Sequence, residues 1–455
     1  MTADKTRTDF TEGSVTVSIL KMGLPSMLGF LSQNIYSMAD MFWVSRLPAS
    51  EAAVAAITFF SNLLWLLFSF NGLVGPGSVA VISRRYGEKK FDHAEASIKE
   101  TFLLKIIFGT LLGIAGWFLL PEMLTVLGAR DESLALGISY GRIMLVGLPV
   151  MYTTYSVFTA LRGIANPNWS MAMMIGSNIL NAVLDPFLIF GWAGLPAFGI
   201  QGAAIASVGS FALTLIIGLV LFSTNATNVR LNLIGKVPLS LVSMWSILRI
   251  GIPAFLGELS FSSSRLVITP LVASFGTVLV AAYGVTLQLF VFGIMMLVGL
   301  GLGLSSLIGH NVGSGKLDRA RMTANQSILL GVSIMTGLGL LSYFGGDFYM
   351  SFFFESPETR QVGAEILRIL SIGFPFVGAF VMIEMIHTGV GMTKPVMVAS
   401  VIHSWLFQVV PAVVLVEVFG LGYTAMWWAF AASGFLTSSW FYIYYRRGKW
   451  LQHKV

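Results

Sequence analysis

The chain of 455 residues contains no cysteine. Disulfide bonds, thiolate metal ligands and cysteine nucleophiles are therefore excluded. The phosphate-binding pattern G-x-x-x-x-G-K-[ST] and the zinc-protease pattern H-E-x-x-H are also absent from the sequence. ATP is thus not expected to drive this chain, and we expect neither an enzyme nor a bound cofactor.

Charged residues are scarce. Only 11% of the residues are charged, whereas 56% are hydrophobic. A soluble domain carries about 25% charged residues, so this chain has too little charge to cover a surface that faces water. Lipid is therefore the expected solvent. The net charge of +6 comes from bases scattered over short segments, which is typical of membrane-protein loops and does not indicate a nucleic-acid partner.

Long apolar stretches fill most of the chain. A membrane-spanning helix needs about 20 mostly apolar residues, and the sequence contains twelve such stretches. They cover residues 15–46, 52–82, 98–120, 133–161, 169–193, 199–223, 242–272, 277–311, 322–344, 359–388, 395–419 and 421–445. The predicted fold class is an all-α polytopic membrane protein with twelve transmembrane helices.

The basic residues predict the orientation. With both termini in the cytoplasm, most of the 27 Lys and Arg residues fall in cytoplasmic segments, as the positive-inside rule requires. Lys105 and Arg162 are counted among them. The exceptions are Arg46, Arg130, Arg142, Arg265, Arg360 and Arg368. We expect a multi-pass protein of the cytoplasmic membrane with both termini inside the cell.

The two halves of the chain repeat the same motifs in the same order. Ser18-Ile-Leu-Lys-Met-Gly-Leu-Pro25 returns as Ser246-Ile-Leu-Arg-Ile-Gly-Ile-Pro253, Tyr86-Gly87 and Asp92 return as Val312-Gly313 and Asp318, and Arg142, Gly147 and Pro149 return as Arg368, Gly373 and Pro375. We predict an N-terminal lobe over 1–223, a cytoplasmic linker over 224–240 and a C-terminal lobe over 241–455, each lobe with six helices. Pro25 and Pro253 can each kink a helix. Two parallel repeats around a central cavity suit alternating access, although packing alone is a second explanation for the duplication.

Two acidic residues lie inside predicted spans. Asp40 falls in the outer half of the first helix and Asp185 in the outer half of the fifth, so both carboxylates are expected in one layer of the N-terminal lobe. A charged group inside a membrane span is costly and indicates function by default. The equivalent positions of the second half hold Ile268 and Pro411, so the acid pair belongs to the first half alone.

Polar neighbours accompany both acids at helical spacing, which puts them on the same helix faces. They are Gln33, Tyr36 and Ser37 beside Asp40, and Asn178 and Asn181 beside Asp185. Pro186 cannot donate a hydrogen bond to the carbonyl of Ala182 and so frees another oxygen. These oxygens could bind Na⁺ at Asp40, Asn181 and Asp185, or the two close carboxyl groups could carry a proton. A hydrogen-bonded network that only locks two helices together is the structural alternative.

The other ionisable residues inside the spans carry weaker signals. Glu258 lies in the inner half of the seventh helix, where it could line a cavity of the C-terminal lobe or reach a polar loop. Glu384 and His387, near the cytoplasmic end of the tenth helix, and Arg265 are expected to extend to the membrane interface. His403 is expected to be a hydrogen-bonded core histidine.

Several motifs together resemble one transporter family over nearly the whole chain. They are Gly23-Leu-Pro25, Tyr36-Ser-Met-Ala-Asp40, Tyr86-Gly87, Leu161-Arg-Gly163, Asn166-Pro167, Asn181-Ala-Val-Leu-Asp185-Pro186 and Gly202-Ala-Ala-Ile-Ala-Ser207. In this order, on a doubled six-helix plan, the chain is similar to the multidrug and toxic compound extrusion (MATE) family. The resemblance implies two six-helix lobes in a V around a central cavity. It also implies export of cationic or amphipathic small molecules by antiport with Na⁺ or H⁺.

The resemblance is to the DinF-like and archaeal branch, in which an acidic pair in the N-terminal lobe couples transport to the ion. It implies coupling residues at Asp40, Asn181 and Asp185, with Ser207 in the place of a hydroxyl ligand. NorM-like members carry further acids in the C-terminal lobe, and Glu258 does not match those positions.

Two other classes of function stay open. A flippase for lipids or lipid-linked oligosaccharides belongs to the same wider superfamily, but it should line its cavity with Arg and Lys, which this chain keeps in its loops. A membrane receptor or channel should carry a substantial ligand or signalling domain. The expected partners are small cationic or amphipathic substrates and membrane lipids, and the expected state is a monomer.

Overall fold

The computed structural model describes residues 9–47, 50–232 and 239–453. Every regular element in these ranges is helical. Eleven helical stretches of the described chain are long and apolar enough to cross a membrane. The predicted class, an all-α polytopic membrane protein, is therefore confirmed.

The first half of the chain folds into seven α-helices. They are α1 (Val15–Val44), α2 (Ser50–Ser69), α3 (Gly75–Gly87), α4 (Phe91–Val126), α5 (Asp131–Gly163), α6 (Pro167–Phe190) and α7 (Ile200–Ser223). The short 3-10 turn η1 (Phe70–Leu73) joins α2 to α3, and the two helices form one apolar stretch over Glu51–Gly87. The first six predicted spans thus coincide with six helical stretches.

The second half repeats this plan. It contains α8 (Leu241–Ala273), α9 (Thr277–Gly313), α10 (Leu317–Ser351), α11 (Pro357–Gly389), α12 (Thr393–Val401), η3 (Ile402–Val409), α13 (Val410–Val413), η4 (Val414–Val418), α14 (Tyr423–Arg446) and η5 (Lys449–Gln452). The segments η3 and η4 are π-helical and flank the turn that holds Pro411. They run on from α12 as one apolar stretch over Thr393–Val418, and α14 corresponds to the last predicted span.

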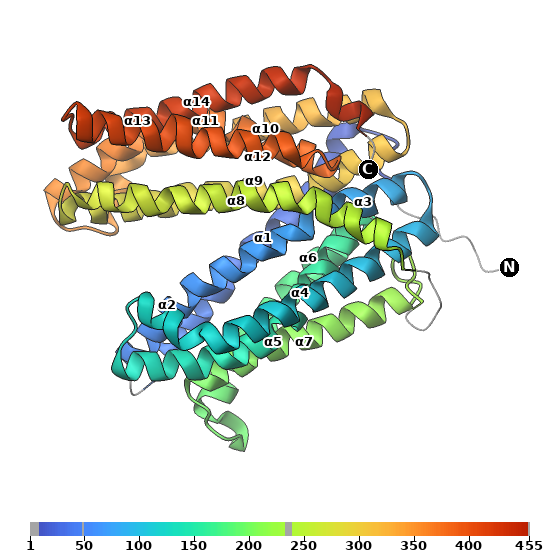
Figure 1. Ribbon diagram of the computed structural model, residues 1–455, viewed down its shortest axis with the longest axis horizontal. Helices are drawn as coiled ribbons and strands as arrows, with labels where there is room; N and C mark the ends of the chain where they lie inside the picture. The colour runs from blue at the N-terminus through green and yellow to red at the C-terminus, as the bar shows by residue number, and fades with distance from the viewer. Residues whose placement is uncertain (1–8, 48–49, 233–238, 454–455) are drawn as a thin grey trace. The chain divides into compact units, whose positions relative to one another are not determined.

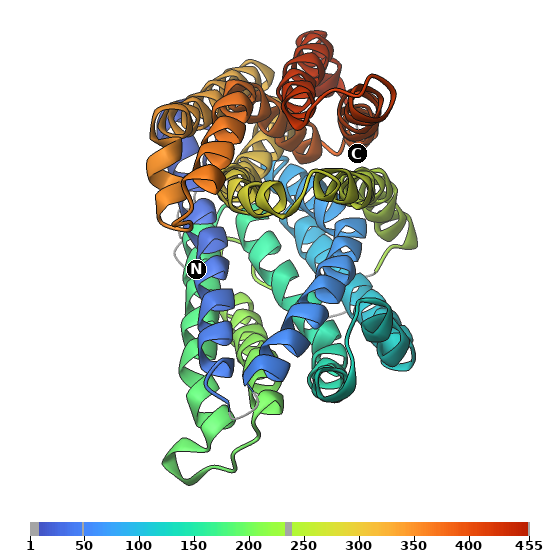
Figure 2. The same ribbon diagram turned by 90° about the vertical axis from the view of Figure 1, so that its left-hand side faces the viewer.

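The chain divides into two compact units. The first contains Leu28–Gly251, and the second contains Thr11–Met27 and Ile252–Val455. Within each unit the long helices lie side by side as a bundle (Figures 1 and 2). The unit boundaries fall inside α1 and α8, next to Pro25 and Pro253. The predicted linker 224–240 lies within the first unit, and its residues 233–238 are outside the described ranges.

Close backbone contacts at two glycines explain these boundaries. In the first unit a Cβ at Gly77 on α3 would collide with the carbonyl oxygen of Ile247 at the start of α8. In the second unit a Cβ at Gly303 on α9 would collide with the carbonyl oxygen of Met22 near the start of α1. Small residues allow this approach in membrane bundles. The start of each repeat's first helix therefore packs into the unit formed by the other repeat.

The repeat is also visible in the turns. The helix α3 ends with Lys89 in the left-handed conformation at φ 60°, and α9 ends with Gly315 at φ 75°. The amide of the following residue bonds the same carbonyl in both turns, from Lys90 to Arg85 at 3.0 Å and from Lys316 to Asn311 at 2.9 Å. This pairing is the Schellman motif that commonly ends helices.

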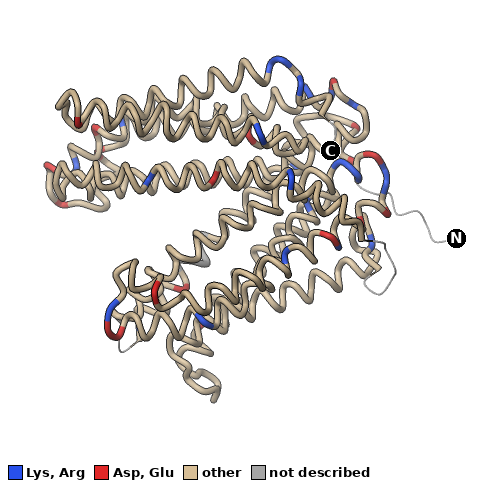
Figure 3. The backbone as a smooth tube through the Cα atoms, viewed as in Figure 1, with Lys and Arg blue, Asp and Glu red and all other residues tan. Residues whose placement is uncertain are grey.

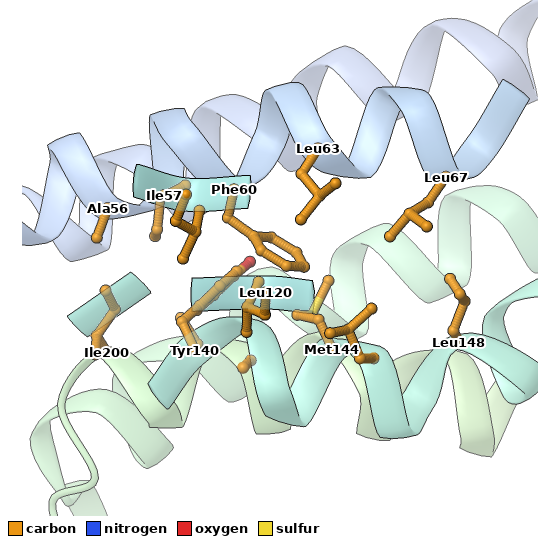
Figure 4. Packing of buried hydrophobic residues seen from close by; sticks show 14 of the residues in the cluster. Ala56, Ile57, Phe60, Leu63, Leu67, Leu120, Tyr140, Met144, Leu148 and Ile200 are labelled. Atoms are coloured by element: carbon orange, nitrogen blue, oxygen red, sulfur yellow. The ribbon is translucent and has the colours of Figure 1, made fainter. Parts of the chain in front are cut away.

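The core of the first unit lies between α2, α4, α5 and α7. Phe60 on α2 packs edge-to-face on Tyr140 of α5, with ring centroids 5.3 Å apart. Leu63 and Leu67 of α2 face Met144 and Leu148 of α5 in the same cluster (Figure 4). This apolar packing fixes the position of Tyr140 beside the acid pair described below.

Charged residues gather toward the ends of the helices (Figure 3), but two bases are buried in the first unit. Lys105 is 2% exposed inside α4, and its ammonium group donates to the carbonyl oxygen of Asn71 at 2.8 Å. Arg162 is 4% exposed at the end of α5 and donates to the hydroxyl of Ser170 at 3.1 Å. Hydrogen bonds to neutral groups thus hold both cations inside the bundle.

Candidate coupling site

The first unit brings Asp40 of α1 and Asp185 of α6 together. The side chains are 6% and 0% exposed, and their carboxyl groups interact with each other. Two buried carboxylates in contact repel each other strongly. A proton or a small cation held between them removes this repulsion.

Asn181 and Ser207 complete the cluster. Asn181 stands one helical turn before Asp185 on α6, and its amide nitrogen donates to the carboxylate of Asp185 at 3.4 Å. The same nitrogen donates to the hydroxyl of Ser207 on α7 at 3.4 Å. Both Asn181 and Ser207 are fully buried. Three helices therefore contribute oxygens to one small buried volume.

Two oxygens of this cluster have no hydrogen-bond donor. They are Oδ2 of Asp185 and Oδ1 of Asn181, both buried. A buried acceptor without a donor costs about 1–3 kcal/mol. Carboxylate, amide and hydroxyl oxygens are the ligands that hard cations prefer, and a carboxyl oxygen can also take a proton. The residues present thus fit either a Na⁺ ion or a proton as a transported species.

Tyr140 of α5 is part of this environment and was not predicted. It is 4% exposed and interacts electrostatically with both Asp40 and Asp185. A tyrosine inside an apolar stretch normally indicates core packing, and its ring does pack on Phe60. No pattern in the sequence separates this tyrosine from other core aromatics, so only the fold reveals its place beside the acids.

The predicted polar stripes hold α1 against its neighbours. The amide nitrogen of Gln33 donates to the hydroxyl of Tyr155 on α5 at 2.9 Å. Asn178 on α6 donates to the hydroxyl of Ser32 on α1 at 2.7 Å. The side chain of Tyr36 lies outside the described part of the chain. Both predicted kink residues stand inside unbroken helices, Pro25 in α1 and Pro186 in α6.

The second unit holds another pair of acids. Glu258 is exposed near the middle of α8, Glu384 is half-buried on α11, and the two carboxyl groups interact electrostatically.

The structure encloses both histidines that the sequence analysis singled out, His387 and His403. His387 is 0% exposed, its Nδ1 lies 2.8 Å from the carbonyl oxygen of Ile383, and its ring stacks on Phe441. The prediction that it extends to the interface was therefore wrong, because aromatic packing encloses it. His403 matches the predicted core histidine, since its Nδ1 lies 3.2 Å from the hydroxyl of Thr437.

The fold defines a multi-pass membrane protein with a buried pair of acids in its first unit. The sequence profile of the family described as MatE matches residues 25–187 and 253–414. The chain therefore belongs to the MATE family, as its motifs indicated. The match falls once in each half of the chain, which agrees with the internal repeat. It does not distinguish branches of the family, so the DinF-like assignment stays a prediction.

Two relatives illustrate this similarity. The chain is 26% identical over 425 residues to the probable multidrug resistance protein YoeA of Bacillus subtilis, covering 93% of this chain and 92% of the relative. It is 26% identical over 381 residues to the multidrug export protein MepA of Staphylococcus aureus, covering 81% and 82% of the two chains.

Solved structures share the fold. A MOP superfamily transporter from Pyrococcus furiosus, described as having a binding pocket of reversed polarity, superposes with a TM-score of 0.87 over 98% of each chain at 22% identity. An outward-facing multidrug resistance MATE family transporter superposes with a TM-score of 0.87 over 97% of this chain and 98% of the other at 23% identity.

Proposed function

We propose that this protein exports small cationic or amphipathic molecules across the cytoplasmic membrane in exchange for Na⁺ or H⁺. The observation that carries the proposal is the contact between the buried carboxyl groups of Asp40 and Asp185. Family membership and the names of the relatives, a multidrug resistance protein and a multidrug export protein, support the class of substrate.

In the proposed cycle, Asp40 and Asp185 bind the coupling ion, while Asn181 and Ser207 supply further oxygens. Ion release leaves two like charges in contact, and ion binding removes their repulsion. The two states of the acid pair therefore favour different conformations of the first unit. An ion can shift a conformational equilibrium only by its difference in affinity for the two states, and the repulsion supplies such a difference. Alternating access then links ion entry to substrate exit.

The test uses the full chain in proteoliposomes loaded with a fluorescent cationic dye. Na⁺ and H⁺ gradients are imposed separately, and dye movement is recorded for the wild type, Asp40→Asn and Asp185→Asn. Asp92→Asn is the matched control, because it makes the same chemical change at an exposed position of α4.

We expect one gradient to drive dye movement in the wild type and the control, and neither Asp40→Asn nor Asp185→Asn to respond. Normal gradient-driven transport by both variants would refute the coupling role of the pair. No movement of any cationic dye in the wild type would refute the exporter, and labelled lipids would then be the next substrates to try.

A further inference from the structure

A groove of about 290 Å³ lies between α10 and α14 in the second unit. Ile328, Leu329 and Val332 of α10 form its apolar wall, and Tyr442 and Arg446 of α14 face them with Asn325. Leu329 is 66% exposed. On a membrane-spanning helix this apolar wall is in the position to contact an acyl chain.

One end of the groove is basic. The guanidinium of Arg446, in the last turn of α14, donates to the hydroxyl of Tyr442 at 3.3 Å. A Cβ at Gly448 would lie 3.7 Å from Nη2 of Arg321 on α10, which brings a second guanidinium to the same end. Neither arginine forms an ion pair with a carboxylate in the described chain. Both are exposed and can therefore bind an external anion.

A hydrogen-bond donor lies between the basic end and the apolar wall. The amide oxygen of Asn325 accepts from the hydroxyl of Tyr445 at 2.7 Å, which fixes the orientation of the amide. Its NH₂ group is then the part of the side chain that can donate into the groove. A phosphate oxygen is a suitable acceptor for this group together with the arginines.

Aromatic residues mark the level of this end in the membrane. Trp440 and Tyr444 stack with centroids 6.3 Å apart, and Tyr445 and Trp450 stack at 5.6 Å. Trp and Tyr are enriched where a membrane meets water. The basic end of the groove therefore lies at the height of lipid headgroups, and the apolar wall lies at the height of acyl chains.

We propose that the α10–α14 groove binds one anionic phospholipid, with its phosphate on Arg446 and Arg321 and an acyl chain along Ile328, Leu329 and Val332. Basic pockets between transmembrane helices at the membrane surface bind anionic headgroups in this way. A zwitterionic lipid fits the apolar wall equally well, but its own cation offsets the attraction of the two guanidinium groups.

The experiment is native mass spectrometry of the full chain, titrated with phosphatidylglycerol or phosphatidylcholine. The variants are Arg446→Gln combined with Arg321→Gln, and Leu329→Trp, which fills the groove without changing charge. Arg447→Gln is the matched control, because Arg447 is exposed on the same turn and does not line the groove. Thermal melting of each variant verifies folding.

We expect the wild type and Arg447→Gln to retain one phosphatidylglycerol more tightly than phosphatidylcholine. Each arginine near an anionic lipid contributes on the order of fivefold in affinity, so the double variant should lose about 25-fold. Leu329→Trp should lose binding of both lipids. Equal retention of the two lipids by the wild type would overturn the proposal. A dimer that dissociates in Leu329→Trp, with lipid retention unchanged, would assign the groove to a second copy and also overturn it.

Discussion

The buried carboxyl groups of Asp40 and Asp185 interact with each other inside the first unit. They come from different helices, α1 and α6, and the neutral side chains of Asn181 and Ser207 bond within the same cluster. Without a proton or a cation, the pair places two negative charges in an apolar interior. Removing one of these two charges should therefore stabilise the folded protein.

Replacing one member of the pair by its amide should stabilise the folded protein while it abolishes coupling. In Asp185→Asn the new NH₂ group can donate to the carboxylate of Asp40, and the repulsion disappears. A hydrogen bond to a charged group contributes about 1.5–3 kcal/mol. We therefore expect a higher melting temperature at neutral pH than for the wild type, measured by intrinsic fluorescence in detergent. A lower melting temperature together with retained transport would contradict this account.

Ser207→Ala distinguishes the two coupling ions. The hydroxyl of Ser207 interacts with Asn181 and offers one of the oxygens that a Na⁺ ion needs. If Na⁺ is the coupling ion, the variant should need a several-fold higher Na⁺ concentration for half-maximal dye transport. If H⁺ is the coupling ion, its transport should keep the wild-type pH profile. Ser210→Ala is the control, since Ser210 lies one turn further on α7 and its hydroxyl donates to the backbone carbonyl oxygen of Ser207 on the same helix.

Gly77→Ala should destabilise the first unit. The added Cβ would collide with the backbone of Ile247, which cannot rotate away as a side chain can. Overpacking of this kind typically costs about 1–3 kcal/mol. Gly303→Ala should have the same effect in the second unit, through the backbone of Met22.

The control for Gly77→Ala is Gly75→Ala, two residues earlier on α3, where a Cβ would meet nothing within 4 Å. Its melting temperature should equal that of the wild type or exceed it slightly. Similar losses of stability in Gly75→Ala and Gly77→Ala would contradict this account, because only Gly77 faces the backbone of α8.

Lys89→Gly should stabilise the protein. Lys89 is an exposed residue held in the left-handed conformation at φ 60°, which costs a residue with a Cβ about 1–2 kcal/mol. Glycine adopts this conformation without strain but loses more chain entropy on folding, so the net gain should be about 0.5–1 kcal/mol. The reverse change, Gly315→Ala in the equivalent turn, should lower the melting temperature. Thermal denaturation of the two variants should therefore show opposite shifts of the melting temperature.

Most of the fold was predictable because membrane helices need only length and apolarity. Each predicted span coincides with a helical stretch, and the prediction that Asp40 and Asp185 lie in one layer of the first half rested on the rise of about 1.5 Å per residue. Ser207 was predicted from the family resemblance alone. Its contact with Asn181 depends on the packing of α7 against α6, which no local pattern contains.

The prediction for His387 failed for a physical reason. Its position near the helix end indicated contact with the membrane interface. Inside the bundle the carbonyl oxygen of Ile383 and the ring of Phe441 supply the contacts that water would have made. Tyr140 illustrates the converse, since an apparently structural aromatic lies beside two acids. Hydropathy cannot predict tertiary contacts that take the place of water around a polar side chain.

The exchange of helix starts between the two units has a consequence for the synthesis of the chain. Residues Thr11–Met27 leave the ribosome early, yet they pack in a unit whose remaining residues begin at Ile252. The first unit, in turn, includes residues up to Gly251, so it is completed only after translation has entered the second repeat. Neither repeat can therefore mature alone as it emerges. The early segment must wait in the membrane for its partners, and a ribosome that stops between the repeats releases the start of α1 without its packing surface.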